Sequence, residues 1–308
     1  MKGLLLSEEY YEVYGRDMIH QHFPAFEERI AVGLAGEGSE CLGYDDNISM
    51  DHDFGPGFCL WLTDEDYQAI GPALQNAYDN LPRNYLGYER IPSRQSADRI
   101  GVMSINNFYR KFVGDINAFS NPLHWLRVPE HLITASISGK VFSDPLGEFS
   151  RIRNFLSSYY PEDIRIKKIA ARLALMAQSG QYNYDRMMKR KEHVAARLSL
   201  DTFIRESMSL AFLLNKIYMP YDKWAFRRVT ELPLMSKTVS LIMELAELPI
   251  TEEYTIGNHI ENICSYALEE LRAQGLTSLN YDFLEYHTSE VMKHIKDPAI
   301  RSLHVMQG

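Results

Sequence analysis

The sequence predicts an α+β protein in which a mixed sheet flanked by helices, residues 1–150, precedes an all-helical bundle, residues 151–308. Two observations predict this division. Short apolar runs bounded by glycine, proline and polar residues, such as Phe58–Leu62 and Ile100–Ile105, are typical of buried strands and lie before about residue 150. Beyond that point apolar residues recur at spacings of three and four, which is the period of one helix face.

Several elements of the N-terminal part have recognisable local signals. An amphipathic helical pattern runs from residue 7 to 32 and is interrupted at Pro24, so a second, short helix is expected over 25–32. A strand is expected over 51–62, and Thr63 is the expected N-cap of the helix that follows and ends near residue 80. The next elements are a loop over 83–99, a strand over 100–105 and a helix over 106–113.

The helical part shows no repeats and no low-complexity linker before it, so we expect the two domains to share a tight cleft. Its apolar spacing predicts helices over residues 161–178, 184–197, 199–216, 234–247, 257–274 and 281–295.

Composition excludes some classes of protein. The chain has 308 residues, of which 45% are hydrophobic and 24% charged, as in ordinary globular proteins. The leucine run at the N-terminus is too short for a signal peptide, so we expect a cytoplasmic protein with no membrane-spanning segment. The three cysteines, Cys41, Cys59 and Cys264, have spacings that argue against a disulfide framework and against a zinc site.

The charge is unevenly distributed. The net charge is −9, yet residues 151–237 contain 17 Lys and Arg against 8 Asp and Glu. Such a basic region would attract a nucleoside triphosphate, whereas the acidic remainder argues against wrapping duplex nucleic acid. For any single Lys or Arg in the region, a solvated helix face is an equally good interpretation.

The stretch from Gly33 to Leu62 contains the strongest chemical signal. Asp51 and Asp53 are separated by one residue, so on an extended strand their carboxylates point to the same face and can share one cation. Magnesium prefers such oxygen ligands together with phosphate oxygens. Gly38 would let the backbone approach a phosphate closely, and Ser39 would add a hydroxyl donor.

The segment GEGSECLGYDDNISMDHDFGPGF, a Gly-Ser followed by Asp-x-Asp and a hydrophobic strand, resembles the signature of nucleotidyltransferases related to DNA polymerase beta. Within that superfamily the chain is most similar to an uncharacterised bacterial family, domain of unknown function 4037. The similarity continues through the segments GKVFSDPLGEF, QYNYDRMMKR and LLNKIYMPYDKWAFRRVTELP, and so covers most of the chain.

The resemblance implies transfer of a nucleoside monophosphate from a nucleoside triphosphate such as ATP to an unknown acceptor. Asp51 and Asp53 would be the catalytic residues and would hold one or two magnesium ions, and Gly38 and Ser39 would bind the nucleotide phosphates. The helical bundle would resemble the C-terminal domain of aminoglycoside nucleotidyltransferases. In the superfamily a third carboxylate commonly lies on a later strand, but the strand 100–105 has no acid. Asp98 and Asp144 are the candidates to replace it.

The basic region supplies further candidate nucleotide-binding residues. Aromatic and basic side chains alternate after Pro220 and could stack a base and hold a triphosphate tail. A helix start with a buried Tyr218 and Trp224 is the alternative. Arg186 and Arg190 are one helical turn apart and could hold a second phosphate. The nucleotide-binding candidates in this domain are Lys216, Tyr218, Tyr221, Lys223, Arg186 and Arg190.

Other polar residues near the aspartate pair fit structural roles better. His52 faces the opposite side of the expected strand, and Asp45 and Asp46 fit Asx turns. Two alternatives to this function remain open. The missing third carboxylate favours a catalytically degenerate nucleotide-binding or regulatory protein, and some minimal nucleotidyltransferases act like antitoxins on a protein or RNA partner.

Overall fold

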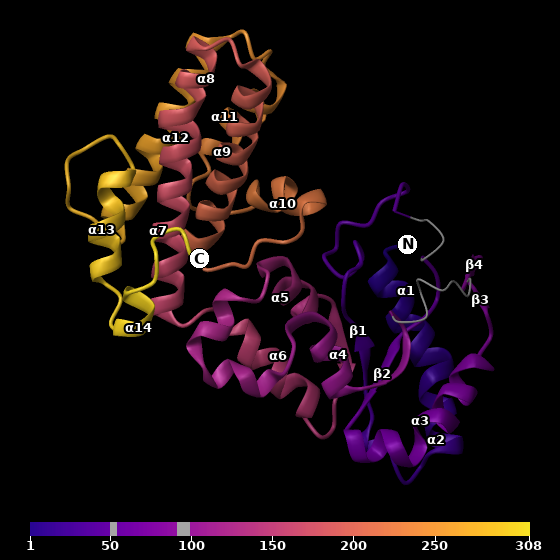
Figure 1. Ribbon diagram of the computed structural model, residues 1–308. Helices are drawn as coiled ribbons and strands as arrows, with labels where there is room; N and C mark the ends of the chain where they lie inside the picture. The colour runs from indigo at the N-terminus through magenta and orange to yellow at the C-terminus, as the bar shows by residue number, and fades with distance from the viewer. Residues whose placement is uncertain (50–53, 91–98) are drawn as a thin grey trace. The chain divides into compact units, whose positions relative to one another are not determined.

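The computed structural model describes residues 1–49, 54–90 and 99–308 (Figure 1). Over these residues the protein has a mixed α+β structure, as the sequence predicts, with one small mixed sheet and many helices. The sheet is formed by the N-terminal half of the chain, and the remainder is helical.

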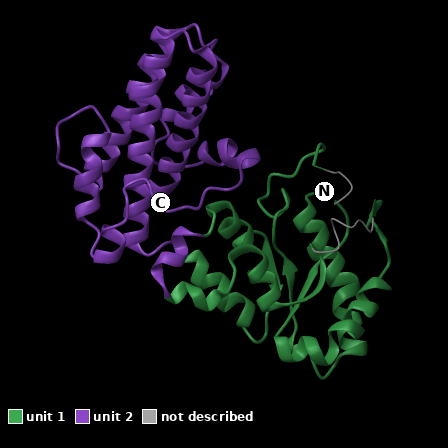
Figure 2. Ribbon diagram, in the orientation of Figure 1, with its two compact units in different colours: residues 1–120, 128–158 green, residues 121–127, 159–308 purple. Residues whose placement is uncertain are grey.

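The chain divides into two compact units (Figure 2). Unit 1 comprises residues 1–120 and 128–158, and unit 2 comprises residues 121–127 and 159–308. The chain therefore passes from one unit to the other three times, and a short segment from the first half of the sequence is part of the helical unit.

Four strands form the sheet of unit 1 in the order β5-β2-β1-β6. β2 pairs antiparallel with β1 and parallel with β5, and β6 pairs antiparallel with β1. The strands are β1 (Ala31–Leu34), β2 (Cys59–Leu62), β5 (Gly101–Ser104) and β6 (Lys140–Ser143). A separate small hairpin consists of β3 (Asn84–Tyr85) and β4 (Tyr88–Glu89).

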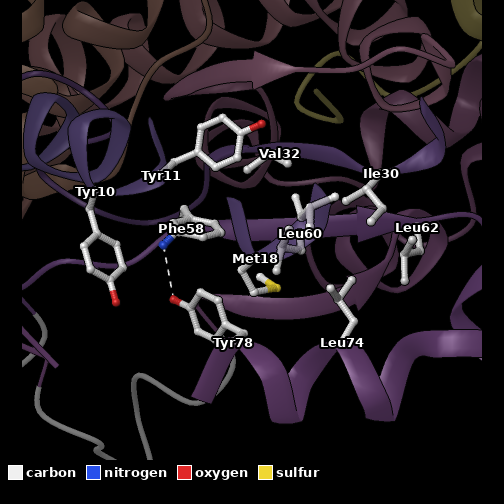
Figure 3. Close-up of a cluster of buried hydrophobic side chains, with 11 residues drawn as sticks. Tyr10, Tyr11, Met18, Ile30, Val32, Phe58, Leu60, Leu62, Leu74 and Tyr78 are labelled. Atoms are coloured by element: carbon white, nitrogen blue, oxygen red, sulfur yellow. Dashed lines mark hydrogen bonds between the residues drawn. The ribbon is translucent and has the colours of Figure 1, made fainter. Parts of the chain in front are cut away.

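Both faces of the sheet are covered by helices because alternate residues of β2 are apolar on opposite sides. Leu60 and Leu62 belong to a buried cluster with residues of the N-terminal helices and of the helix after β2 (Figure 3). In that cluster the backbone N–H of Phe58 donates a hydrogen bond of 3.2 Å to the Tyr78 hydroxyl. Trp61 points the other way and stacks on Phe149, with ring centroids 3.8 Å apart.

Two helices of unit 1, α3 and α4, have side-chain N-caps, Thr63 and Ser104. Thr63 caps α3 as the sequence predicts, its hydroxyl oxygen accepting a hydrogen bond of 3.2 Å from the backbone N–H of Asp66. The helices are α1 (Gly3–Tyr10), the π-helical turn Tyr11–Gly15, α2 (Arg16–His22), α3 (Asp64–Asp79), α4 (Ile105–Val113), α5 (Glu130–Ile137) and α6 (Glu148–Ser157), with 3-10 turns at Glu27–Arg29 and Ile116–Ser120.

Two predictions for the N-terminal part were wrong in detail. The expected helix over 25–32 is a 3-10 turn followed by β1, because Ala31–Leu34 is fully buried between two neighbouring strands. Of the strand expected over 51–62, residues 51–53 lie outside the described residues, and over 54–62 the strand begins at Cys59, since Gly55, Pro56 and Gly57 precede it and proline cannot donate to a strand ladder.

Unit 2 is entirely helical over its described residues, and α7 and α9 form its central antiparallel pair, against which α12 and α13 also pack. The sequence predicts two helices over 184–197 and 199–216, whereas the structure has a short α8 and then one continuous α9. The helices are the 3-10 turn Pro122–Leu126, α7 (Glu162–Met176), the π-helical turn Ala177–Tyr184, α8 (Asp185–Lys189), α9 (His193–Leu214), α10 (Asp222–Val229), α11 (Thr238–Glu247), α12 (Glu253–Ala273), α13 (Glu285–Lys293) and α14 (Pro298–Arg301).

Candidate functional site

The Gly38-Ser39 segment forms a compact turn directly after β1. The Gly38 carbonyl accepts a hydrogen bond of 3.0 Å from the N–H of Cys41. The Ser39 carbonyl accepts two, from Leu42 at 3.2 Å and from Tyr44 at 2.9 Å. Ser39 itself is buried. We call residues 36–44 the glycine turn.

The space beside Gly38 is occupied by the Glu40 side chain. An ideal Cβ built on Gly38 would lie 2.3 Å from Oε1 of Glu40. The Glu40 carboxylate therefore rests against the Gly38 backbone, and its Oε1 accepts a hydrogen bond of 2.5 Å from the Arg99 guanidinium. The Glu40 carboxylate thus lies beside Gly38 with the Arg99 guanidinium next to it. A phosphate bound in place of that carboxylate would require the same neighbouring cation.

The glycine turn and the chain that leads into β2 lie at the same end of the sheet. β1 and β2 are antiparallel with Gly33 opposite Cys59, so the end of β1 and the start of β2 adjoin. An ideal Cβ on Gly3 would lie 2.9 Å from both Glu40 Cβ and Phe54 Cε2. The residues that directly follow Ser39 and Asp53 in the sequence thus meet at the start of α1.

The proposed metal ligands Asp51 and Asp53, with His52 between them, lie outside the described residues, as does Asp98. Among the residues that the structure describes, no group of three or more His, Cys, Asp or Glu side chains could hold a metal ion.

Asp45 and Asp46 have structural roles next to the glycine turn. Oδ1 of Asp46 accepts hydrogen bonds of 3.0 Å from the N–H groups of Ile48 and Ser49, which is the Asx turn that the sequence predicts. Asp45 is buried and instead accepts a hydrogen bond of 2.8 Å from the N–H of Gly3, at the first turn of α1. A carboxylate at a helix N-terminus is favoured by the helix dipole.

Asp144, a candidate for the third carboxylate, is occupied with the N-terminus of α6. Its Oδ1 accepts from the N–H of Gly147 at 3.1 Å, and its Oδ2 accepts from the N–H of Ser150 at 2.7 Å. Both oxygens therefore stabilise the first turn of the helix.

Two cysteines lie close to the glycine turn without the properties of nucleophiles. Burial raises the pKa of the Cys41 thiol well above its usual value and that of Cys59 to about 12. Both stay protonated at neutral pH, as buried packing cysteines do.

The candidate residues around α10 have mixed surroundings. Tyr218 is only 5% exposed, and its ring packs against Tyr159 and Tyr160 at centroid distances of 4.6 and 4.8 Å. This matches the alternative of a core aromatic. Lys223 is exposed, with its Nζ 5.0 Å from the centroid of the Trp224 ring.

Tyr221 and Lys216 both lie at helix ends. The Tyr221 carbonyl accepts from the N–H of Trp224 at 2.9 Å, so Tyr221 begins α10. Lys216 follows α9 with a φ of 54°. The N–H of Lys216 donates to Leu213 and that of Ile217 to Phe212, which together form a Schellman motif.

Arg186 and Arg190 are far from the other candidates of unit 2. They lie in and just after α8, whereas Lys216 follows the opposite end of α9 (Figure 1). α9 has 22 residues, so these two groups are separated by about 33 Å at a rise of about 1.5 Å per residue. The two groups therefore do not form one site within unit 2. The Arg186 guanidinium lies over the ring of Tyr182, 4.5 Å from its centroid.

A cavity of about 140 Å³ opens elsewhere in unit 1, and none of the residues that the sequence singled out lines it. It lies near the start of β1, at the opposite end of that strand from the glycine turn. Its lining residues are Tyr11, Arg16, Ile19, Glu27, Glu28, Ile30, Ser143 and Pro145.

Sequence reasoning missed Arg99 and Glu40. Arg99 lies at the start of β5 and its carbonyl accepts a hydrogen bond of 3.1 Å from the Cys59 thiol, so it is fixed at the same end of the sheet as the glycine turn. A single arginine at the end of a polar stretch gives no recognisable signal, because its partner is 59 residues away in the sequence.

With this geometry described, comparison with known proteins gives one family. Residues 125–225 match the family model "Domain of unknown function (DUF4037)", which confirms over that range the similarity that the sequence motifs predict. The match covers two of the motifs, GKVFSDPLGEF and QYNYDRMMKR, and part of the third. The glycine turn lies outside it. No curated protein matches the chain.

One similar solved structure is that of a nucleotidyltransferase-like protein from Exiguobacterium sibiricum 255-15. It has 12% sequence identity to this chain, with 94% of this chain and 81% of that chain covered, at a TM-score of 0.37. Of the helices that the structure describes, none combines the length and apolar character needed to cross a bilayer.

Proposed function

We propose that the protein is a magnesium-dependent nucleotidyltransferase that transfers a nucleoside monophosphate from a nucleoside triphosphate to an unidentified acceptor. The observation that carries the proposal is the meeting of two chain segments at one end of the sheet. Glu40, next to Ser39, and Phe54, next to Asp53, both contact the position of Gly3. Phe54 directly follows the Asp-x-Asp segment in the sequence, and this supports the proposal that the glycine turn and that segment act in one site.

The reaction would be an in-line displacement at the α-phosphorus. An acceptor hydroxyl, which loses its proton to solvent, or a phosphate oxygen would form the new P–O bond, the bond to the bridging oxygen would break, and pyrophosphate would leave with the electron pair. The carboxylates of Asp51 and Asp53 are ligands of the kind magnesium prefers, and the ion would orient the phosphates and offset their developing charge. The glycine turn would bind the phosphate tail through backbone N–H groups and Ser39.

Arg99 would supply positive charge to the same site. Its guanidinium already donates to the carboxylate that lies against Gly38, and the guanidinium geometry fits a phosphate as well as a carboxylate. A phosphate entering beside Gly38 would displace the Glu40 carboxylate and take over its contact with Arg99.

A second function, nucleotide binding without catalysis, is favoured by a specific observation. β5 has no acidic residue, and both oxygens of Asp144 are engaged at the N-terminus of α6. Without a positioned base the enzyme would forgo a contribution of about 10²- to 10⁴-fold. Tight magnesium-dependent binding of a triphosphate with no pyrophosphate release would identify this function.

The test is calorimetric titration with ATP, GTP, CTP and UTP, each with and without magnesium, together with an assay for pyrophosphate release. We expect Asp53→Asn to abolish magnesium-dependent binding or turnover and to leave the thermal midpoint nearly unchanged, because a metal ligand contributes little to packing. Mutual repulsion with Asp51 would also be relieved.

The matched control is Asp17→Asn, which changes an exposed carboxylate on α2 and should behave as wild type. A loss of stability in Asp53→Asn comparable with a core truncation, with nucleotide affinity unaltered, would show that the aspartate pair is structural and would refute the proposal.

A further inference from the structure

Arg153 on α6 makes an unusual set of contacts. Its Nε and one terminal nitrogen donate to the Ile137 carbonyl at 3.0 and 2.7 Å, and the same terminal nitrogen donates to the Gly139 carbonyl at 2.7 Å. These carbonyls belong to the connection between α5 and β6. Burial lowers the pKa of the guanidinium, but an arginine remains charged at any physiological pH.

That connection in turn holds the glycine turn from both sides. The Ser138 hydroxyl donates a hydrogen bond of 2.9 Å to the Gly36 carbonyl, and the N–H of Gly139 donates one of 2.8 Å to the Cys41 carbonyl. Gly36 and Cys41 flank the two residues proposed to bind phosphate. A shift of the connection would therefore move both ends of the phosphate-binding segment.

The charge of Arg153 is not used in an ion pair within the described part of the chain. Its hydrogen-bond partners are backbone carbonyls, and no described carboxylate lies within ion-pair distance of it. Carbonyl dipoles compensate a guanidinium only in part, so a positive potential remains behind the glycine turn. Such a potential favours an anion there.

From these contacts we infer that Arg153 is a positioning residue that sets the shape of the glycine turn for a polyphosphate, acting through Ser138 and Gly139. The inference rests on the proposed function. Arginine is required because its Nε and one terminal nitrogen, held in one plane, make three hydrogen bonds together, and a lysine ammonium has no counterpart of the Nε donor to Ile137.

The experiment compares two variants with two matched controls. Arg153→Lys keeps the charge and removes the fork, and Ser138→Ala removes only the hydroxyl that holds Gly36. The controls are Arg151→Lys, which changes an exposed arginine on the same helix, and Ser136→Ala, whose hydroxyl donates within α5 to the Ile133 carbonyl. Ser138→Thr restores a hydroxyl and serves as the rescue.

Binding is measured with magnesium ATP, with magnesium tripolyphosphate as a base-free probe, and with AMP. We expect Arg153→Lys and Ser138→Ala to weaken ATP and tripolyphosphate binding by about three- to tenfold, the effect of one lost hydrogen bond, and to change AMP binding less than about twofold. Ser138→Thr and both controls should bind as wild type does.

Hydrogen exchange at the Gly139 amide, which donates to the Cys41 carbonyl, measures how firmly the connection between α5 and β6 holds the glycine turn. This measurement needs no ligand. We expect faster exchange in Arg153→Lys and Ser138→Ala. Faster exchange with unchanged ATP affinity would overturn the inference, because the contacts would then be structural only. Unchanged exchange and unchanged affinity would overturn it as well. If Arg153→Lys does not fold, Ser138→Ala and its rescue decide the outcome.

Wild-type behaviour separates this inference from the proposed function. If the wild-type protein binds neither magnesium ATP nor magnesium tripolyphosphate, the proposed function fails and the inference falls with it. If the wild type binds both and the variants match it, the inference alone is refuted.

Discussion

At the scale of single residues, several side chains that suggest chemistry also have a clear structural position. Lys216 is the clearest case. It stands at the left-handed position of the Schellman motif that ends α9, where glycine is the usual residue because a Cβ is strained there. Lys191 occupies the equivalent position after α8, with a φ of 61°. A lysine at such a position costs stability.

We therefore expect Lys216→Gly to raise the free energy of unfolding by up to about 1 kcal/mol, as relief of left-handed strain. Lys191→Gly is the matched control and should give a similar gain in urea denaturation. Calorimetry with magnesium ATP then separates the two lysines. A loss of affinity in Lys216→Gly alone would show that Lys216 is kept for nucleotide binding, whereas equal affinities would leave it as a helix-end residue.

Lys167 gives a prediction about pH. It is fully buried on α7, its Nζ donates to the carbonyls of His304 and Val305, and burial lowers its pKa to about 8. In the unfolded chain the pKa of a lysine is about 10.4. Between these values the unfolded state binds more protons, so this residue's contribution to stability rises with pH.

We expect Lys167→Met to be most favourable relative to wild type below about pH 8 and to lose that advantage as the pH rises toward about 10. Urea denaturation of both proteins at several pH values measures the difference. The comparison with wild type is needed because burial raises the pKa of cysteines such as Cys41. Those cysteines make the total stability fall as the pH rises, which is opposite to the effect of Lys167. A difference independent of pH would contradict the assignment.

At the scale of secondary-structure elements, the sequence predicted an element correctly where residues at its two ends mark where it begins and ends. α3 was predictable because Thr63 caps it and a proline follows its end. β1 was not, because four apolar residues fit a helix or a strand equally well and only pairing with β2 and β6 decides.

The candidate site divides in the same way. The glycine turn could be recognised from adjacent residues. The hydrogen bonds that hold it in place could not. Ser138 and Arg153 come from about a hundred positions later in the chain, and the bonds they make go to backbone carbonyls, which any sequence supplies. The pairing of Arg99 with Glu40 was hidden for the same reason, since no short motif contains both residues.

The close approach of β1 and β6 gives a prediction for this scale. Gly139 has a φ of 79°, and an ideal Cβ there would lie 2.0 Å from the Leu34 carbonyl oxygen. Gly147 has a similar φ of 71° but nothing within 4 Å. We expect Gly147→Ala to cost about 1 kcal/mol and Gly139→Ala about 2–4 kcal/mol in urea denaturation, the excess coming from displaced backbone. Equal costs would show that the strands can separate without penalty.

At the scale of the whole molecule, the units do not follow the order of the sequence. The segment 121–127 precedes the last elements of unit 1, yet it packs within unit 2. Its Trp125 is 2% exposed, and its ring lies 5.7 Å from that of Tyr160. Apolar periodicity indicates which residues are buried but not which element they pack against. A single boundary at residue 150 therefore could not assign the segment 121–127 to unit 2.

We expect Trp125→Ala to lower the stability of unit 2 by about 3–5 kcal/mol, as for other buried aromatic truncations. Hydrogen exchange should accelerate in α7 and stay slow in α6. The control is Phe119→Ala, six residues earlier, whose ring lies 6.1 Å from that of Phe155 on α6. That change should accelerate exchange in α6 instead. Exchange that rises in α6 for both variants would contradict the division into units.

The same segment has a consequence for the time at which the protein folds during synthesis. Trp125 leaves the ribosome well before α7, the helix on which its segment packs and which ends at Met176. At about 5–20 residues per second, the intervening stretch takes roughly 3–10 s to translate. During those seconds the Trp125 side chain waits for α7, while the last elements of unit 1, residues 128–158, are also being made. A newly made chain is therefore most open to chaperones and to aggregation in this interval, before the second unit exists.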